Sequence, residues 1–472
     1  MASEPRVLAV DQHFDLCIIG TGSGNSILDH RFDDWNVAIV ERGVFGGTCL
    51  NVGCIPSKML IYPADIVEHL RHGRELGVDA TLDGVRWADI RDRTFGRIDP
   101  IAESGRQYRI DLPNVTVFED DARFTGHKTL QVGDNTITAD RFVIAAGART
   151  HIPPIPGLDH VDYDTSDTIM RIDRVPDRLA ILGGGFIGAE MGHVFDAFGA
   201  EVTMILRGPA LLRTEDTEIS RRVTERLGDR FNLLCDATPR SVSMDGDTFV
   251  IEVDTPSGLV VVEADRLLVA TGRVPNGGQL NVEATGVRLD VDGYVITDDH
   301  LRTDVDGILA LGDVRNALQL KHIANLEARV VQHNLLHPDE PRAIDERFVP
   351  HAVFTNPQIG AVGLTEQAAL ATDRPFVTAV KDYGATAYGW AMEDTSSACK
   401  LIADVATRQL IGAHIIGPQA SILIQQLVQG MRFGQTVDQM AIDVIYPHPA
   451  LSEVVENALL DLVKALDAAS AV

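Results

Sequence analysis

The chain has 472 residues and a formal net charge of −27, from 41 basic and 68 acidic side chains. At roughly 100–200 residues per domain, this length predicts about three domains. The acidic excess argues against a nucleic-acid partner and against docking on an anionic membrane, because both would repel the protein.

Hydrophobic and cysteine content limit the cellular setting. The sequence has no uncharged apolar run long enough to cross a membrane, and its first residues lack the basic and apolar stretches of a secretory signal. Five cysteines in so long a chain exclude a disulfide-stapled extracellular scaffold. We therefore expect a cytoplasmic protein, in which two neighbouring cysteines are catalytic or metal-binding more often than structural.

The first chemical motif begins after the apolar run 16–19. Three alternate glycines follow this run: Gly20, Gly22 and Gly24. The pattern predicts a buried parallel strand, a tight turn and a helix start, as in a dinucleotide-binding unit that holds a pyrophosphate, although Asn25 stands at the third glycine position. Glu41 ends the next predicted strand, 37–41, where a carboxylate would bind a ribose hydroxyl.

A second unit of the same kind covers 179–190 and continues into a strand at 201–207. Its glycine pattern is complete, with Gly183, Gly185 and Gly188. Its second strand ends in Arg207, and Arg213 follows. Two guanidinium groups suit a ribose 2′-phosphate, which favours NADP over NAD, although two solvated surface arginines are the alternative. Because Glu41 stands at the matching place in the first unit, we predict two different dinucleotides.

The third motif is the segment 46–58, which contains Cys49 and Cys54. On an ideal helix their Cα atoms would lie roughly 8–9 Å apart, whereas a disulfide needs about 4.4–6.8 Å. If the two cysteines bridge, the helix must be distorted between them, and Gly53 is placed to allow this. Such strain makes a disulfide reducible. Two unrelated thiols are the alternative.

No metal site is expected, because paired CxxC spacing is absent and no other Cys or His lies near this segment. The remaining cysteines fit packing positions: Cys17, Cys235 and Cys399.

Two further stretches present single functional groups. His448 stands between two prolines, and Glu453 follows it at a distance that allows the carboxylate to orient the imidazole. Dithiol exchange needs such a proton donor, but a helix-capping segment with a surface histidine explains the stretch equally well. A predicted strand ends in Gly312 and Asp313, where the carboxylate can bind a polyol or simply belong to a turn.

In this order, the motifs resemble the FAD-dependent pyridine nucleotide–disulfide oxidoreductases over nearly the whole chain, and the segment 46–58 is the most specific. The resemblance implies an α/β fold with two Rossmann-like dinucleotide-binding domains and a C-terminal α+β dimerisation domain. The implied segments are FAD-binding 1–150 and 279–345, NADPH-binding 151–278, and the interface domain 346–472.

The resemblance also implies how the catalytic residues divide the work. Cys54 faces the flavin, and Cys49 exchanges with the substrate. His448 and Glu453 form an acid–base dyad that the other subunit of a homodimer donates.

Further residues are implied around the cofactors. Lys58 is the lysine beside the flavin, Glu190 is its ion-pair partner, and Asp313 binds the ribitol region. The other implied cofactor contacts are Gly47, Thr48, Gly147, Gly272 and Gly312.

Four stretches resemble the branch of the family that reduces mycothione, the symmetric disulfide of mycothiol: 20–29, 95–102, 388–396 and 448–460. Asn25 belongs to this resemblance, and Cys49 argues against the transhydrogenase branch, which lacks it. The implied reaction is reduction of mycothione with NADPH and FAD. The alternatives are another disulfide (glutathione, bis-γ-glutamyl or lipoyl) and a non-catalytic dimeric interaction protein.

Overall fold

The computed structural model describes residues 12–471, which form two compact units. Each unit is assembled from three separate stretches of the chain. Unit 1 consists of the described residues up to Pro56, Asp92–His151 and Arg273–Glu346. Unit 2 consists of Ser57–Arg91, Ile152–Gly272 and the described residues from Arg347 onward. The expectation that the N-terminus is no secretory signal concerns residues that lie mostly outside the described ones. The domain boundaries predicted from the sequence stay a prediction.

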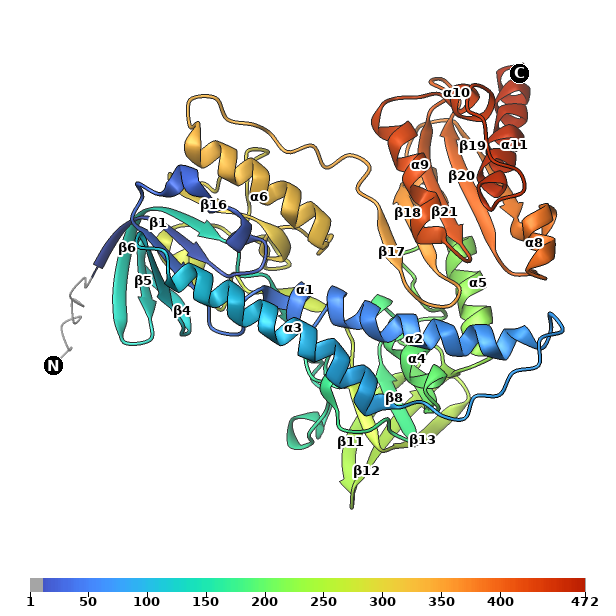
Figure 1. Ribbon diagram of the computed structural model, residues 1–472, viewed down its shortest axis with the longest axis horizontal. Helices are drawn as coiled ribbons and strands as arrows, with labels where there is room; N and C mark the ends of the chain where they lie inside the picture. Colours follow the sequence, from blue (N-terminus) through green and yellow to red (C-terminus); the bar gives the residue numbers. More distant parts are fainter. Residues whose placement is uncertain (1–11, 472) are drawn as a thin grey trace. The chain divides into compact units, whose positions relative to one another are not determined.

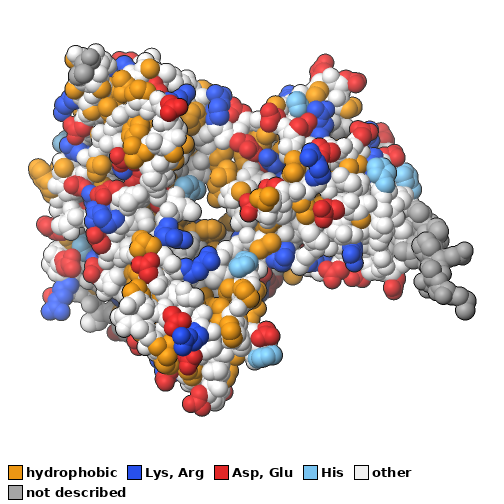
Figure 2. Space-filling view, turned by 180° about the vertical axis from the view of Figure 1, so that it is seen from behind, with side chains coloured by type: hydrophobic (Ala, Val, Ile, Leu, Met, Phe, Trp, Pro, Cys, Tyr) orange, Lys and Arg blue, Asp and Glu red, His pale blue; other side chains and the backbone are white. Residues whose placement is uncertain are grey.

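The surface carries both acidic and basic side chains, as the composition of the sequence indicates. On the face shown in Figure 2, acidic and basic side chains are interspersed rather than gathered into one patch. Among the described residues, every helix is too short or too polar to cross a membrane.

Unit 1 is built on a seven-stranded sheet in the order β3-β2-β1-β6-β5-β4, with β16 also paired to β6. Its strands are β1 (Gln12–Ile19), β2 (Val37–Val40), β3 (Val115–Phe118), β4 (Ala122–Gly126), β5 (Thr129–Val132), β6 (Asn135–Ile144) and β16 (Ile308–Ala310). The pairs among β3, β2, β1, β6 and β16 are parallel. All four residues of β2 are buried, as expected for a parallel strand covered on both faces.

Helices and short strands complete unit 1. These elements are α1 (Gly47–Asn51), the start of α2 (Cys54–Gly73), most of α3 (Trp87–Ile110), β7 (Ala148–Thr150), β15 (Arg273–Pro275), η5 (Val282–Thr285), η6 (Gly312–Val314) and α6 (Lys321–Leu336). Apolar side chains of α6 pack with those of β1 and β2 in one core cluster, so α6 covers one face of the sheet (Figure 1).

The prediction of a helix directly after the first glycine loop is wrong. Two 3-10 turns, η1 (Gly24–Ser26) and η2 (His30–Phe32), stand in its place. The buried guanidinium of Arg109 donates to the side-chain oxygen of Asn25 at 2.8 Å and to its carbonyl oxygen at 2.6 Å. A continuing α-helix would use that carbonyl internally, so the Arg109 contacts replace the regular helix and explain why Asn25 stands where a glycine was expected.

Unit 2 contains the second dinucleotide-binding fold. Its parallel sheet has the order β10-β9-β8-β14, which repeats the order β3-β2-β1-β6 of unit 1. The elements are β8 (Arg178–Leu182), α4 (Phe186–Ala197), β9 (Glu201–Ile205), α5 (Thr217–Gly228), β10 (Asn232–Leu234) and β14 (Arg266–Val269), with an antiparallel sheet of β11 (Thr238–Asp245), β12 (Thr248–Thr255) and β13 (Gly258–Ala264) and the turns η3 (Leu158–His160) and η4 (Ile169–Arg171). Here the predicted strand, glycine turn, helix and second strand are confirmed.

The C-terminal part of unit 2 is an antiparallel five-stranded sheet in the order β17-β18-β21-β20-β19. Its elements are β17 (His351–Val353), β18 (Ile359–Gly363), α7 (Glu366–Leu370), β19 (Phe376–Asp382), η7 (Tyr383–Ala385), α8 (Ala387–Ala391), β20 (Ala398–Asp404), β21 (Leu410–Ile416), α9 (Ala420–Arg432), α10 (Val437–Ile442) and α11 (Ser452–Ser470). The predicted α+β character and the strand at 398–404 are confirmed, while the strand predicted over 348–354 is shorter, at His351–Val353.

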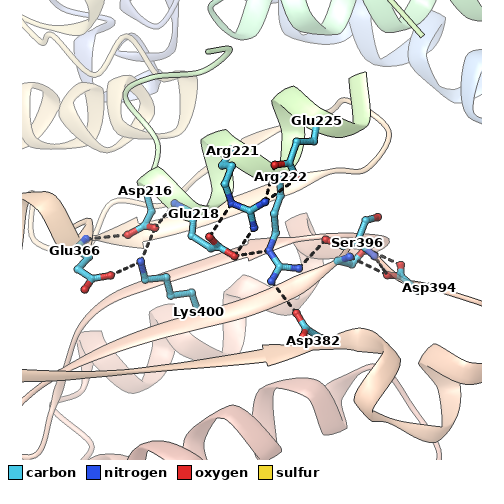
Figure 3. A network of polar contacts seen from close by, with 11 residues as sticks. Asp216, Glu218, Arg221, Arg222, Glu225, Glu366, Asp382, Asp394, Ser396 and Lys400 are labelled. Carbon is cyan, nitrogen blue, oxygen red and sulfur yellow. Dashed lines mark hydrogen bonds and ion pairs between the residues drawn. The ribbon is translucent and has the colours of Figure 1, made fainter. Parts of the chain in front are cut away.

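Strand β20 alternates between two environments. Cys399, Leu401 and Ala403 pack with α9 and α11 in the apolar core. Because side chains alternate along a strand, Lys400 points to the opposite face, where it meets α5 and α7. Figure 3 shows its ammonium group between Asp216, the N-cap of α5, at 2.7 Å and Glu366 at 2.5 Å.

Asp216 is fully buried, and burial alone would raise its pKa. Hydrogen bonds from Lys400 and from the backbone N–H of Glu366 outweigh burial and lower the pKa of Asp216. Nearby, Arg222 of α5 extends the network to Asp382 at 2.8 Å and to the carbonyl oxygen of Ser396 at 3.0 Å (Figure 3). Helix α5 of the second dinucleotide-binding fold is therefore fixed to the C-terminal sheet by the buried Lys400–Asp216 pair and by the contacts of Arg222.

The substitution Lys400→Met tests this network. Removing one partner of a buried ion pair leaves the other charge uncompensated and costs about 3–5 kcal/mol, so we expect a fall of that size in the free energy of unfolding in urea. The matched control is Lys464→Met, since Lys464 is exposed in its pair with Asp461 and an exposed pair contributes about 0–1 kcal/mol. Equal effects of the two substitutions would contradict a stabilising role of the buried pair.

Candidate active site

The two cysteines of the 46–58 segment lie on either side of a helix break. Helix α1 ends at Asn51, Val52 adopts a non-helical backbone with φ −143° and ψ 17°, and α2 begins at Cys54. A Cβ on Gly53 would lie 2.9 Å from the carbonyl oxygen of Thr48, so a larger residue would collide with the preceding turn. The helix is thus broken between the cysteines, as a Cys49–Cys54 disulfide was predicted to require, while both cysteines are free thiols in this structure.

The Cys49 and Cys54 side chains are hydrogen bonded to each other. This bond, followed by burial and the negative charge of Cys54, raises the pKa of the Cys49 thiol, while the positive charge of Lys321 opposes the rise. Cys49 is half-buried and Cys54 is exposed. The direction of this shift favours the protonated thiol, and only the thiolate is a nucleophile.

The glycine loop of unit 1 packs directly against the helix that carries Cys49. A Cβ on Gly47 would lie 2.7 Å from the Cα of Gly22. The backbone N–H of Gly46 donates to the hydroxyl of Thr21 at 3.2 Å. The cysteine pair is thus held against the loop that the sequence assigns to a pyrophosphate.

Glu41 is bound within its own loop. One carboxylate oxygen accepts from the backbone N–H and the hydroxyl of Thr21 at 2.9 and 2.6 Å, and the other accepts from the backbone N–H of Gly43 at 2.9 Å. A carboxylate has about four acceptor positions, which leaves one on the second oxygen. Glu41 can therefore fix the loop and still accept one ribose hydroxyl.

The two glycine loops make the same backbone contact. Gly20 and Gly183 have φ of +102° and +113°, and a Cβ on either would lie 2.3 Å from a carbonyl oxygen, that of Ala145 or Ala270. Only glycine fits such a turn. Gly24 and Gly188 also occupy crowded positions: their Cβ atoms would meet Ala145 and Gly183 at 2.8 and 2.6 Å.

Other predicted glycines face open space instead. Gly185, Gly147 and Gly272 have no atom within 4 Å of an added Cβ, and the last two have φ of +65° and +116°. Gly185 is also the N-cap of α4, where backbone N–H groups point outward. The crowded glycines let the chain turn tightly against the neighbouring strand, and the open glycines leave room for a ligand next to the backbone. A dinucleotide needs both features, so the residues of both units fit the predicted cofactors.

Asp313 lies in the short turn η6, directly after β16. Burial raises its pKa, and the positive charges of Arg273 and Lys321 oppose the rise. The preceding Gly312 has a φ of +75° and donates its backbone N–H to the buried carboxylate of Glu327. Glu327 was missed by the sequence reasoning, because nothing local marks a helix residue that shapes a turn.

Glu327 is held by two further donors in unit 1. Arg315 and Asn316 donate to its other oxygen at 2.7 and 2.9 Å. Burial raises the pKa of Glu327, with the Arg315 charge and these hydrogen bonds opposing it. Its contacts fix the turn that presents Asp313.

In unit 2, Lys58 of α2 and Glu190 of α4 form an ion pair at 2.6 Å. The second oxygen of Glu190 accepts from the backbone N–H of Phe354 at 2.9 Å, and the Lys58 ammonium lies 4.5 Å from the centre of the Phe354 ring. Phe354 is a further residue that the sequence did not indicate. It fixes both members of the pair.

Arg207 and Arg213 lie close together after β9. Both are exposed, and a Cβ on Gly208 would lie 2.6 Å from the guanidinium of Arg213. The Arg213 side chain therefore covers the backbone next to Arg207. Within residues 12–471, neither guanidinium is engaged in an ion pair, and both remain available to an anion.

His448 lies in the loop between α10 and α11. Its Nδ1 is 2.6 Å from a carboxylate oxygen of Glu453, in the first turn of α11, and its side chain is 72% exposed. This hydrogen bond leaves Nε2 directed away from Glu453 and able to exchange a proton. Beside it, Ile442, Val444 and Ile445 are all exposed, and a group of exposed apolar side chains is typical of a surface that another chain covers.

The described arrangement can be compared with known proteins. Residues 14–328 match the pyridine nucleotide-disulphide oxidoreductase family, and residues 349–459 match the dimerisation domain of that family. Over 459 residues the chain is 49% identical to mycothione reductase from Mycobacterium tuberculosis, covering 95% of this chain and 99% of that protein. Mercuric reductase from Staphylococcus aureus is 34% identical over 453 residues, with 95% of this chain and 82% of that protein covered.

A solved structure gives the same result. The HOCl-induced flavoprotein disulfide reductase RclA from Escherichia coli aligns with a TM-score of 0.82 at 27% identity, covering 94% of this chain and 99% of that one. The expected α/β fold with a C-terminal dimerisation domain is thereby confirmed. The chain belongs to the pyridine nucleotide-disulphide oxidoreductases and is a flavoprotein disulfide reductase.

Proposed function

We propose that the chain is an NADPH- and FAD-dependent reductase of mycothione that acts as a cytoplasmic homodimer. The observation that carries the proposal is the hydrogen-bonded pair of Cys49 and Cys54 at a helix break, packed against a dinucleotide loop. The name of the Mycobacterium tuberculosis relative supports mycothione as the substrate.

Each cofactor has its own set of residues in this proposal. Bound FAD supplies the two-electron link between the nicotinamide and the cysteine pair. The residues that would hold it are Gly20, Gly22, Gly24, Asn25, Glu41, Gly47, Thr48, Gly147, Gly312 and Asp313, with Lys58 and Glu190 beside the flavin. The residues that would hold NADPH are Gly183, Gly185, Gly188, Arg207, Arg213 and Gly272.

The oxidative half-reaction follows from the thiol geometry. The Cys49 thiolate attacks one sulfur of mycothione, forming a mixed disulfide, and the S–S electron pair leaves with the first mycothiol thiolate, which His448 protonates. The Cys54 thiolate then attacks the Cys49 sulfur. The Cys49–Cys54 disulfide forms again, and the second mycothiol leaves as a thiolate that takes up a proton.

His448 has two duties because the pKa of Cys49 is raised. It first takes the Cys49 proton as a base, and it then gives that proton to the leaving thiolate. Glu453, at 2.6 Å, holds the ring in one tautomer and orientation. The exposure of His448 and Ile445 supports action on Cys49 of the other subunit.

The substrate can be tested by NADPH consumption against a panel of disulfides: mycothione, glutathione disulfide, bis-γ-glutamylcystine and lipoamide. We expect the highest kcat/KM with mycothione, no turnover in Cys49→Ser, and normal turnover in the control Cys235→Ser. A preference for another disulfide would reassign the substrate. Inactivity on the whole panel in the yellow, FAD-loaded protein would favour a non-catalytic interaction protein.

The substitution Arg207→Glu tests the choice of nucleotide. We expect the wild type to prefer NADPH by at least about tenfold in kcat/KM, because a charge-assisted hydrogen bond contributes about 1.5–3 kcal/mol. Arg207→Glu should erode the preference mainly through the KM for NADPH. The control Arg226→Glu changes an exposed arginine of α5 and should leave it intact. Equal use of NADPH and NADH by the wild type would refute this assignment.

Mixed dimers test whether His448 acts across the interface. Combining a Cys49→Ser chain with a His448→Ala chain leaves one intact site if the histidine acts in trans, so about half of the wild-type activity should return. His448→Ala homodimers should lose about 10²–10⁴-fold in the oxidative half-reaction. Their reduction by NADPH should persist, because it does not use His448.

The reciprocal dimer supplies the control. When a wild-type chain is paired with a chain carrying both substitutions, trans geometry leaves no intact site and cis geometry leaves one. Activity in this second dimer, together with none in the first, would show that His448 serves its own chain.

A further inference from the structure

Lys321, the first residue of α6, has no role in the proposed reaction so far, yet it lies beside the redox centre. Its ammonium group donates to the hydroxyl of Ser23, in the unit 1 glycine loop, at 2.8 Å. The Ser23 hydroxyl in turn donates to the side chain of Asn325, one helical turn further along α6, at 3.2 Å. Two side chains of α6 therefore clamp the loop between Gly22 and Gly24.

Backbone contacts link the clamped glycine loop to the helix that carries Cys49. Gly22, next to Ser23, packs against Gly47, where a Cβ would leave only 2.7 Å to the Gly22 Cα. Gly47 is the first residue of α1, and Cys49 lies in the same helical turn. A positive charge fixed to this loop is consequently fixed relative to Cys49.

The Lys321 ammonium is bound to a neutral hydroxyl, and its charge also acts on the carboxyl group of Asp313. Within the described part of the chain, no carboxylate forms an ion pair with it, and its hydrogen bond to a neutral hydroxyl uses one of its three donors. The groups that act on the Cys49 thiol are Cys54, which raises its pKa, and Lys321, which lowers it. Asp313 also experiences the charges of Lys321 and Arg273.

We propose that Lys321 is a positioning residue that holds a permanent positive charge beside Cys49, so that the attacking thiolate of the proposed reductase forms more readily. An opposite charge nearby favours the charged form of an ionisable group. Removal of this charge should therefore disfavour the Cys49 thiolate and favour the Cys49–Cys54 disulfide. The inference rests on the proposed function only for the role of Cys49.

The experiment measures ionisation of Cys49 directly and uses neither NADPH nor a disulfide substrate. In the FAD-loaded Cys54→Ser protein, the rate of Cys49 alkylation by iodoacetamide is followed against pH by mass spectrometry of the Cys49 peptide. We expect the midpoint of this profile to rise by about one pH unit in Lys321→Gln, which corresponds to the lower end of the effect of a nearby charge.

The choice of variants separates charge from hydrogen bonding. Glutamine at position 321 can still donate to Ser23 but carries no charge, whereas Lys321→Arg keeps both and should retain the original midpoint. Lys128→Gln is the matched control, because Lys128 lies in the same unit and donates to the carbonyl oxygen of Asp140 at the surface. If Lys321→Gln keeps the original midpoint, the charge has no role and the proposal is overturned.

A second measurement does not depend on the Cys54→Ser substitution, so it remains possible if that variant fails to fold. With both cysteines present, and at an alkaline pH at which the reduced Cys49 is a thiolate, the dithiol–disulfide equilibrium of Lys321→Gln against a dithiol buffer should shift toward the disulfide by about tenfold, or about 30 mV for a two-electron couple. An unchanged equilibrium would also overturn the proposal. Because neither readout depends on turnover, failure of the mycothione assignment would appear only in the disulfide panel.

Discussion

The backbone of Gly47 packs against the backbone of Gly22, so closely that a side chain on Gly47 would lie within 2.7 Å of its neighbour. This contact joins the helix that carries Cys49 to the dinucleotide loop, and Thr21 and Glu41 lock the loop with hydrogen bonds of 2.6–3.2 Å. In the proposed reductase, electrons pass between a cofactor and the cysteine pair, which requires the two to keep a fixed separation. Backbone atoms, and not flexible side chains, hold the Cys49 helix against the loop that would bind the cofactor.

The groups that influence the Cys49 proton, and the histidine proposed to exchange it, come from different helices and loops. The hydrogen bond to Cys54 and partial burial raise the pKa of the Cys49 thiol, and the charge of Lys321, which has no ion-pair partner among the described residues, opposes the rise. His448, oriented by Glu453, is exposed and free to meet another chain.

The two dinucleotide-binding folds share one backbone plan but differ in the residues that would decide which dinucleotide each one binds. Both share the strand order and the 2.3 Å glycine contact with the end of a neighbouring strand. They differ after the second strand, where unit 1 has Glu41 and unit 2 has Arg207. They also differ in the segment that directly follows the glycine loop. In unit 1, Arg109 supplies a positive charge and hydrogen bonds where unit 2 has the regular helix α4.

The sequence by itself determined the features that depend on neighbouring residues. Glycine turns after apolar strands, the spacing of Cys49 and Cys54 with its helix break, and the pairing of His448 with Glu453 are all local, so they can be read from short patterns. Only the tertiary structure decided the partners that meet from far apart, such as Arg109 with Asn25 or Phe354 with Glu190, which are separated by 84 and 164 residues. Lys321 and Ser23 are 298 residues apart. Such contacts leave no local signal, because any buried polar group needs a partner but the chain can supply it from any element that folding brings near.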